Sequence, residues 1–416
     1  EILIGLVGSE MCIRDRYQYL SKQDRAFMTR LVDGTIEYML QLDYIIDSFS
    51  KTKVRKMKPF IRNLLRMSVY QIKYMDAVPD SAVCNEAVKL AKRHKFAQLS
   101  GFVNGVLRNI ARNIDSVQFD TLSIRYSMPQ WIVDRFVAAY GEKKAEEIFK
   151  AFHNKSTISI RTNLTRCTPD ELRATLEAEG VTVTAVDELN YAFVISGFDY
   201  LNGLQSFRDG LFYVQDISSM LVAQTAAPKK GDYVIDVCAA PGGKSTHIAE
   251  LLRGSGHVFA RDLTDNKVDM IEENIDRHGL NNMSAEVWDA TVFDADSAGK
   301  ADILICDLPC SGLGVLGRKK DIRYKMTPES VDELAALQRQ ILDTVHTYVK
   351  PNGVLVYSTC TIDEAENEDN VRWFIEKHPE FELDKSFAEG TGMKQILPGE
   401  HGSDGFFIAR FIKSKL

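Results

Sequence analysis

The chain has 416 residues, of which 45% are hydrophobic and 26% charged, a composition ordinary for a folded protein of two to three domains. No run of about 18 apolar residues occurs, which excludes a membrane-spanning helix. Seven cysteines are too few for a disulfide-rich scaffold, and we expect a cytoplasmic, monomeric protein. The formal charge of −7 argues, taken alone, against a nucleic-acid partner.

The charge is unevenly distributed along the chain. Residues 17–126 contain 18 Lys and Arg against 10 Asp and Glu, whereas residues 127–416 contain 31 against 45. The first stretch therefore carries +8 and the second −14. This asymmetry predicts a basic binding module joined to an acidic body, although solvated helix faces can produce the same imbalance by chance.

The first 16 residues, EILIGLVGSEMCIRDR, do not fit the rest of the chain. The segment lacks an initiator Met, and its short apolar part follows Glu1 rather than a basic region, so it is not a secretory signal. It resembles translated adaptor sequence. We predict that residues 1–16 are not native to the protein, and we assign no function to Cys12.

Residues 17–126 are predicted to form a helical domain. Between residues 101 and 112 the apolar side chains recur at helical spacing on one face: Phe102, Val103, Val106, Leu107 and Ile110. Near a helix break at Pro59 lies a basic cluster of Lys51, Lys53, Arg55, Lys56 and Lys58. This cluster predicts an exposed positive patch suited to phosphates; the alternative is a merely solvated loop.

Residues 127–205 are predicted to form a small α+β connector that contacts RNA. Helical patterns cover 129–140 and 143–153, and an alternating strand pattern begins at Ile158. Thr168 and Pro169 are typical of a helix start. Two further short strands are expected at 181–186 and 192–195.

From about residue 206 to 416, strands alternate with helices, which predicts a parallel sheet. The candidate strands are 233–237, 257–261, 284–288, 303–306, 354–358 and 406–412. The candidate helices are 244–253, 266–278, 328–349 and 364–378.

The sequence VIDVCAAPGGKST at 234–246 places a glycine-rich turn between a strand and a helix. Glycines at this position let a ligand approach the amino end of the helix closely. A phosphate-binding P-loop would need Gly where Cys238 stands, and the spacing Gly-x-Gly-x-x-Gly of dinucleotide sites is missing. The turn therefore predicts a ligand that need not carry phosphates.

Acidic residues follow successive predicted strands: Asp236, Asp262, Asp289 and Asp307. A carboxylate in the place of Asp262 can accept both hydroxyls of a ribose, and Asp289 is placed to meet an adenine edge. Each residue alone would more often be a helix cap or a turn residue. The ordered series predicts a site for S-adenosylmethionine.

Two cysteines follow strands in the same register. Cys310 belongs to the sequence DLPCSGLG at 307–314, and Cys360 to YSTCT at 357–361. If the two strands are neighbours, both thiols lie at one sheet edge, across the cofactor pocket. Cys306, inside an apolar strand, is interpreted as a buried structural residue. We expect no metal site, since no His lies at ligand spacing and no Cys-x-x-Cys occurs.

A thiol beside a methyl donor points to a particular chemistry. Carbon 5 of cytosine is a poor nucleophile, and addition of a thiolate to carbon 6 pushes electron density onto it. A carboxylate such as Asp307 can stabilise protonation at ring nitrogen 3. The target base must be presented unstacked.

These motifs resemble those of the RNA cytosine-5 methyltransferases, most closely the bacterial small-subunit ribosomal RNA enzymes with an amino-terminal NusB-like domain. The resemblance rests on the segments DVCAAPGGK, DLPCSGLG and STCT, together with GFVNGVLR at 101–108, FYVQDISS at 212–219 and GSDGFF at 402–407. The resemblance implies a NusB-like helical bundle over 17–126, the connector over 127–205, and a Rossmann-like class I methyltransferase domain over 206–416. The implied substrate is small-subunit (16S) ribosomal RNA.

The resemblance also implies roles for residues. Cys360 is the implied nucleophile, and Cys310 assists release of the methylated base. The implied S-adenosylmethionine contacts are Cys238, Ala239, Ala240, Pro241, Gly242, Gly243, Lys244, Asp262, Asp289 and Asp307. The chain departs from the family pattern at Leu308, where Ala is usual, and at Arg261, where a small or apolar residue is commoner.

The segment after the first cysteine loop is rich in positive charge: Arg318, Lys319, Lys320, Arg323 and Lys325. Beside a catalytic edge these residues would engage RNA phosphates, with Tyr324 available for stacking, unless the loop is merely solvated. Two other functions compete. A non-catalytic RNA-binding regulator would need neither Cys360 nor the Asp series, and a nucleotide hydrolase is disfavoured by Cys238.

Overall fold

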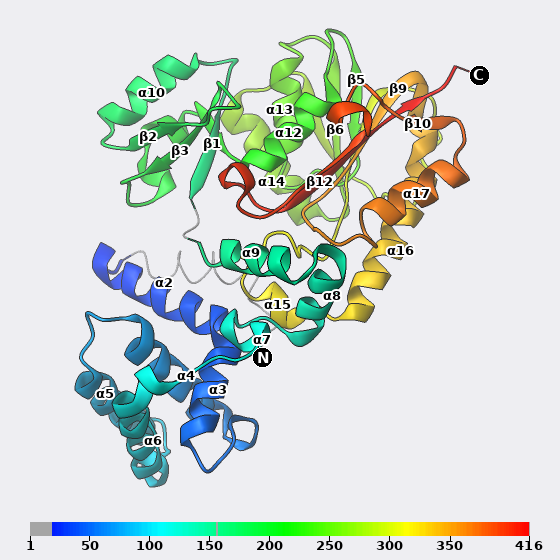
Figure 1. The fold of residues 1–416 in the computed structure, drawn as a ribbon. Helices are drawn as coiled ribbons and strands as arrows, with labels where there is room; N and C mark the ends of the chain where they lie inside the picture. Colours follow the sequence, from blue (N-terminus) through cyan, green and yellow to red (C-terminus); the bar gives the residue numbers. More distant parts are fainter. Residues whose placement is uncertain (1–18, 155–156, 416) are drawn as a thin grey trace. The chain divides into compact units, whose positions relative to one another are not determined.

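The computed structural model describes residues 19–154 and 157–415 (Figure 1). The prediction for residues 1–16 lies outside the described residues. The described chain forms two compact units. One contains the residues up to His153 together with Lys319–Lys325, and the other contains Asn154–Arg318 and Met326–Leu416. Across the described residues, we find no helix with the length and apolar character needed to cross a membrane.

The first unit is helical, as predicted. Its α-helices are α2 (Lys22–Glu37), α3 (Met39–Phe49), α4 (Pro59–Tyr74), α5 (Asp80–Arg93), α6 (Ser100–Asn113), α7 (Leu122–Arg125), α8 (Gln130–Tyr140), α9 (Glu142–Phe152) and α15 (Ile322–Lys325). Short 3-10 turns are η1 (Val54–Lys56), η2 (Ala97–Leu99) and η3 (Ile114–Ser116). The buried face of α6 is the predicted one, with Val103, Val106, Leu107 and Ile110 in the core. The partner α4 begins at Pro59, whose fixed φ suits the first turn of a helix.

The second unit begins with an antiparallel sheet in the order β2-β3-β1-β4. Its strands are β1 (Ile158–Thr162), β2 (Thr182–Ala185), β3 (Ala192–Ser196) and β4 (Phe212–Val214). Between them lie α10 (Pro169–Ala178), η4 (Leu201–Gly203) and α11 (Gln205–Arg208). Thr168 and Glu171 form the capping box that starts α10. Because β4 pairs with β1, this sheet extends beyond the expected boundary at residue 205.

The larger sheet has the order β10-β12-β9-β8-β5-β6-β7, with β11 paired to β12. Its strands are β5 (Tyr233–Asp236), β6 (His257–Asp262), β7 (Met283–Val287), β8 (Ala301–Asp307), β9 (Val349–Thr359), β10 (Phe381–Leu383), β11 (Met393–Ile396) and β12 (Phe406–Lys413). The five strands β5 to β9 are mutually parallel, which confirms the parallel sheet. The antiparallel β12 closes one side.

Helices cover both faces of this sheet. The remaining elements are α12 (Ile217–Ala226), α13 (Gly243–Leu251), α14 (Asp265–His278), α16 (Pro328–Val345), α17 (Glu368–Lys377), η5 (His346–Tyr348), η6 (Ala388–Gly390) and η7 (Glu400–Gly402). One core cluster joins α16 and α17 to the sheet, and a second joins α12, α13 and α14 to it. The result is the Rossmann-like, three-layer arrangement that the strand–helix alternation predicted.

Candidate active site

The acidic residues of the predicted series follow strands that are neighbours in the sheet. Asp236 ends β5, Asp262 ends β6 and Asp307 ends β8. Since β6, β5, β8 and β9 are adjacent and parallel, their carboxyl ends meet at one edge. Asp289 lies two residues beyond the end of β7, at the same edge.

The two predicted cysteines converge at this edge. The Sγ atoms of Cys310 and Cys360 lie 3.2 Å apart, and both thiols are half-buried. The hydrogen bond with Cys360, followed by burial, raises the pKa of the Cys310 thiol well above its ordinary value. Cys306 is fully buried inside β8, and burial raises the pKa of its thiol, as fits a structural cysteine.

Two glycines let the cysteine loops approach each other. The Gly314 N–H donates to the carbonyl oxygen of Cys360 at 3.1 Å, and the Gly405 N–H donates to Gly314 at 2.9 Å. A Cβ on Gly314 would lie 2.3 Å from the carbonyl oxygen of Gly405. Only glycine fits there, so the DLPCSGLG and GSDGFF motifs share a packing requirement.

A buried carboxylate supports the first cysteine loop from below. Glu366 accepts hydrogen bonds from the Ser311 N–H at 2.8 Å and from Gln338 Nε2 at 3.0 Å. Ser311 Oγ also donates to it, and burial raises the pKa of the Glu366 carboxyl. The sequence analysis missed this residue, because a lone Glu in a predicted helix carries no motif signal.

Lys244 and Asp307 form an ion pair beside the thiols. Lys244 Nζ lies 2.7 Å from Asp307 Oδ2, and Ser358 Oγ donates to Asp307 Oδ1 at 2.7 Å. Burial works to lower the pKa of the Lys244 ammonium, but Asp307 first, then Asp236 and Cys360, raise it overall. The ammonium therefore stays charged within electrostatic range of Cys360.

The glycine turn precedes α13 as predicted. Gly242, with φ +101°, occupies the left-handed region at the N-cap, and no side chain caps the helix there. Ser245 Oγ donates to the buried Asp236, whose pKa burial raises to about 7. Burial also raises the pKa of the Cys238 thiol, which keeps it protonated. The turn thus offers free N–H groups at a helix amino end.

Asp262 and Asp289 differ in their surroundings. Asp262 is buried and accepts from the Ala240 N–H at 2.9 Å and from Lys267 Nζ at 2.8 Å. Asp289 is exposed, and hydrogen bonds from Thr291 lower the pKa of its carboxyl. Asp289 is therefore a turn-forming residue in this structure.

The comparisons with known proteins cover the same three regions. A family model described as 16S rRNA methyltransferase RsmB/F matches residues 223–412. The NusB family model matches residues 8–112, and a ferredoxin-like domain model of RsmF/B-like methyltransferases matches residues 128–198. The NusB match includes residues 8–16, which the sequence analysis set aside.

Relatives extend over nearly the whole chain. The probable ribosomal RNA small subunit methyltransferase B of Bacillus subtilis (strain 168) is 39% identical over 412 residues, covering 95% of this chain and 92% of that protein. The similarly named protein of Synechocystis is 33% identical, with the same coverage. The chain belongs to the RsmB/F family of 16S rRNA methyltransferases.

Solved structures agree with the family. The crystal structure of PH0851 has a TM-score of 0.82 at 26% identity, covering 97% of this chain and 93% of that one. NSun6 from Pyrococcus horikoshii, solved with SFG, an analogue of S-adenosylmethionine, has a TM-score of 0.63 at 25% identity. It covers 69% of this chain and 99% of its own. The RsmB/F-family chain is thus a methyltransferase built on an S-adenosylmethionine-dependent fold, with the NusB-like domain that its motifs implied.

In this RsmB/F-family chain, Arg318 connects two motif segments. Its guanidinium lies 2.7 Å from Asp216 Oδ2 and 2.7 Å from Asp404 Oδ2. Asp216 belongs to the FYVQDISS motif and is the N-cap of α12, and Asp404 belongs to GSDGFF. Arg318 therefore links the two motif segments, and its predicted contact with RNA stays a prediction. The sequence analysis assigned no role to either carboxylate.

Among the other four residues of this basic segment, the predicted RNA contact is corrected only at Arg323, and it stays a prediction at Lys319, Lys320 and Lys325. Arg323 is fully buried, Lys320 pairs with Glu37 at 2.6 Å, and Lys325 pairs with Asp321 at 2.7 Å. The Tyr324 hydroxyl bonds to Ser127. Lys320 and Lys325 are thus paired with carboxylates of the first unit.

Proposed function

We propose that the chain transfers a methyl group from S-adenosylmethionine to carbon 5 of a cytosine in small-subunit ribosomal RNA. The reaction proceeds through a covalent bond between Cys360 and carbon 6 of the base. The observation that carries the proposal is the 3.2 Å approach of the Cys310 and Cys360 Sγ atoms at the sheet edge that holds the glycine turn. A methyltransferase acting on an exocyclic amine or a ribose hydroxyl needs no such pair.

The residues at this edge fit S-adenosylmethionine. Uncapped N–H groups at the start of α13 suit a carboxylate, and the Asp262 and Asp289 carboxylates suit ribose hydroxyls and an adenine amine. The Asp262 contact requires Lys267, whose side chain is 49% exposed, to share or leave the carboxylate. When bound, S-adenosylmethionine supplies the electrophilic methyl group.

The unequal surroundings of the two thiols favour Cys360 as the nucleophile, in agreement with the family resemblance. The raised pKa of Cys310 keeps that thiol protonated, while the Lys244 ammonium favours negative charge at Cys360. The Cys360 thiolate adds to carbon 6, and Asp307 supports protonation at ring nitrogen 3. Carbon 5 then forms its bond to the methyl group as the bond between the methyl group and the sulfonium breaks. Loss of the carbon 5 proton returns electrons to the ring and breaks the bond between the Cys360 sulfur and carbon 6, and Cys310 assists this release.

We further propose that the helical domain supplies the RNA-binding charge. The predicted basic cluster surrounds η1, and all five of its members are exposed: Lys51, Lys53, Arg55, Lys56 and Lys58. Lys53 Nζ donates to the carbonyl oxygen of Asp47 at 2.9 Å, and the other four side chains make no hydrogen bond or ion pair within the described part of the chain. Four of the ammonium and guanidinium groups therefore point to solvent and can release counterions on binding phosphates.

The test is the identity of the methylated product. The full chain is incubated separately with small-subunit and with large-subunit ribosomal RNA and radiolabelled S-adenosylmethionine, and each RNA is digested to nucleosides. We expect the label in 5-methylcytidine. Label in N4-methylcytidine or in a 2′-O-methyl nucleoside would overturn the proposal, and label confined to large-subunit RNA would overturn the substrate.

A further inference from the structure

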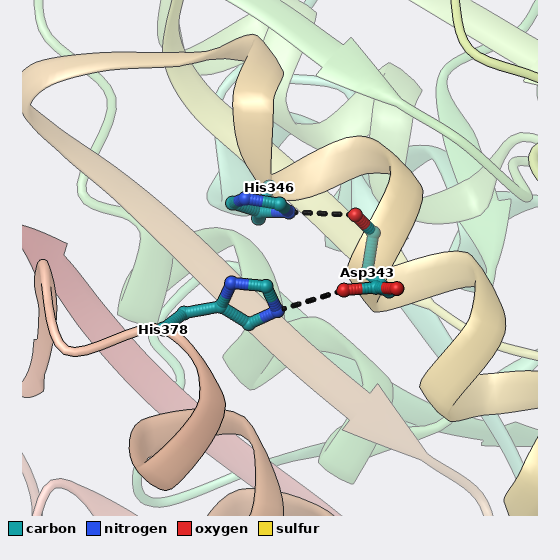
Figure 2. Close-up of side chains that lie close together, drawn as sticks. All are labelled: Asp343, His346 and His378. Atoms are coloured by element: carbon teal, nitrogen blue, oxygen red, sulfur yellow. Dashed lines mark hydrogen bonds and ion pairs between the residues drawn. The ribbon is translucent and has the colours of Figure 1, made fainter.

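The side chains of two histidines and a carboxylate lie close together (Figure 2). They lie near the amino end of β9, whereas the thiols lie at its carboxyl end. Asp343 and His346 lie one helical turn apart, at the end of α16 and in η5, and His378 follows α17. One potential ligand atom of each residue lies within 4.8 Å of the others. The cluster plays no part in the proposed reaction.

The tautomer of His346 is fixed by its backbone. His346 Nδ1 lies 2.8 Å from the carbonyl oxygen of Asp343, and a carbonyl oxygen can only accept. Nδ1 therefore carries the proton, and Nε2 is left with a lone pair. Histidine ligands of metals usually donate their second ring N–H to such a group, which orients the imidazole.

His378 presents an unsatisfied nitrogen to the same space. Its side chain is only 9% exposed, and Nε2 has no hydrogen-bond partner among the described residues. The nearest charged atom is Asp343 Oδ1, at 3.2 Å.

The neighbouring charges complete a ligand environment. Lys377 Nζ lies 2.9 Å from Asp343 Oδ2, which leaves Oδ1 directed at His378. Glu380 Oε1 lies 3.7 Å from His346 Nε2 and offers a further oxygen. Without a cation, the lone pair of His346 Nε2 faces this carboxylate, an arrangement that positive charge between them would relieve.

We propose that Asp343, His346 and His378 bind one divalent transition-metal ion of the zinc type, with Glu380 or water as the fourth ligand. Imidazole and carboxylate ligands suit Zn²⁺, and tetrahedral bonds of about 2.0–2.1 Å place adjacent donors roughly 3.3 Å apart. The Asp343–His378 pair already has this spacing. The His346 ring lies against the His378 ring, with centroids 3.9 Å apart, and must turn to bring Nε2 to the same ion. Because the cluster lies far from the reacting edge, the ion would clamp α17 and β10 to α16.

The experiment measures Zn²⁺ binding to the full chain at pH 7.5 in a Cys310→Ser/Cys360→Ser background, because the two thiols could also hold zinc. We expect one Zn²⁺ per chain by competition with a chromophoric chelator. At a hundredfold excess over Kd, the Tm should rise by on the order of 5 °C. Binding should be lost in His346→Gln and His378→Gln and kept in the control His401→Gln, which removes an exposed histidine elsewhere.

A second measurement needs no histidine variant. Zn²⁺ should protect His346 from modification by diethyl pyrocarbonate, mapped by mass spectrometry, without protecting His401. Absence of stoichiometric binding, or binding that survives both histidine substitutions, would overturn the proposal. Modification of His346 at the same rate with and without Zn²⁺ would also overturn it.

Discussion

The Cys310 and Cys360 Sγ atoms lie 3.2 Å apart although 50 residues separate them in the chain. Their loops follow the neighbouring parallel strands β8 and β9, and the Gly314–Cys360 backbone bond holds the loops together. The two thiols are nevertheless not equivalent. Of the two, only Cys360 is among the groups whose charge raises the pKa of the Lys244 ammonium. Each substitution should therefore stop the reaction at a different step.

Replacing Cys360 with Ala should reduce methyl transfer by about 10⁴-fold or more, since the nucleophile is lost. Binding of S-adenosylmethionine should persist, because the glycine turn is untouched. Filter-bound labelled RNA and calorimetry measure the two properties. The matched control is Cys167→Ala, which removes a half-buried thiol elsewhere. Normal turnover in the Cys360→Ala protein would contradict the assignment.

Replacing Cys310 with Ala should instead trap the enzyme on its product, since release of the covalent bond is impaired. We expect an RNA–protein adduct that survives denaturing electrophoresis and requires S-adenosylmethionine. The double variant Cys310→Ala/Cys360→Ala should form none. Ordinary product release from the single variant, without an adduct, would remove this role from Cys310.

The buried Arg161–Glu250 pair should make a large contribution to stability. Arg161 is fully buried and also donates to Gln215 at 2.9 Å and Thr246 at 3.1 Å. Arg161→Met strands a buried carboxyl and should lower the free energy of unfolding by about 3–5 kcal/mol. Urea unfolding measures the loss, and Arg161→Met/Glu250→Gln should recover part of it. An equal or larger loss in the double variant would mean that the unpaired charge is not the cause.

His278 should make stability fall with acid. Burial lowers its pKa to about 4, against an ordinary value of 6.5, so the folded chain binds fewer protons than the unfolded chain between these values. Stability is therefore retained above pH 6.5 and lost as the pH falls toward 4, by up to about 3 kcal/mol. Urea unfolding of His278→Gln should show a flatter decline over this window. A parallel decline in both proteins would assign the effect to other groups.

The basic cluster around η1 should set the salt dependence of RNA binding. Changing Lys51, Arg55, Lys56 and Lys58 to Ala should reduce the slope of log affinity against log salt by about 3. The matched control removes four exposed lysines of the second unit, Lys229, Lys230, Lys385 and Lys394. Full-length proteins are compared by filter binding. A slope unchanged by the first set would refute the phosphate patch.

The strands and helices of the catalytic half could be predicted from sequence because their signals are local. The predicted strand at 257–261 is β6 at His257–Asp262, and the predicted helix at 266–278 is α14 at Asp265–His278. The convergence of Cys310 and Cys360 followed from one further condition, that their strands be neighbours, which the sheet satisfies.

Long-range charge pairing could not be predicted in this way. Lys320 and Glu37 are 283 residues apart. The sequence pattern of a lysine-rich segment is the same whether its side chains face water or a buried carboxylate. The Asp343–His346–His378 cluster was missed for the same reason. Two of its members are one turn apart, but the third arrives only through the packing of α17 against α16.

The Lys319–Lys325 segment belongs to the helical unit, although the chain reaches it only after four of the eight strands of the larger sheet. During translation, Glu37 is made long before Lys320 can neutralise it. At roughly 5–20 residues per second, the ribosome needs on the order of ten seconds or more to bridge that interval. The helical unit therefore cannot complete its fold until residues 319–325 have been made. The folding of each unit thus depends on the synthesis of part of the other.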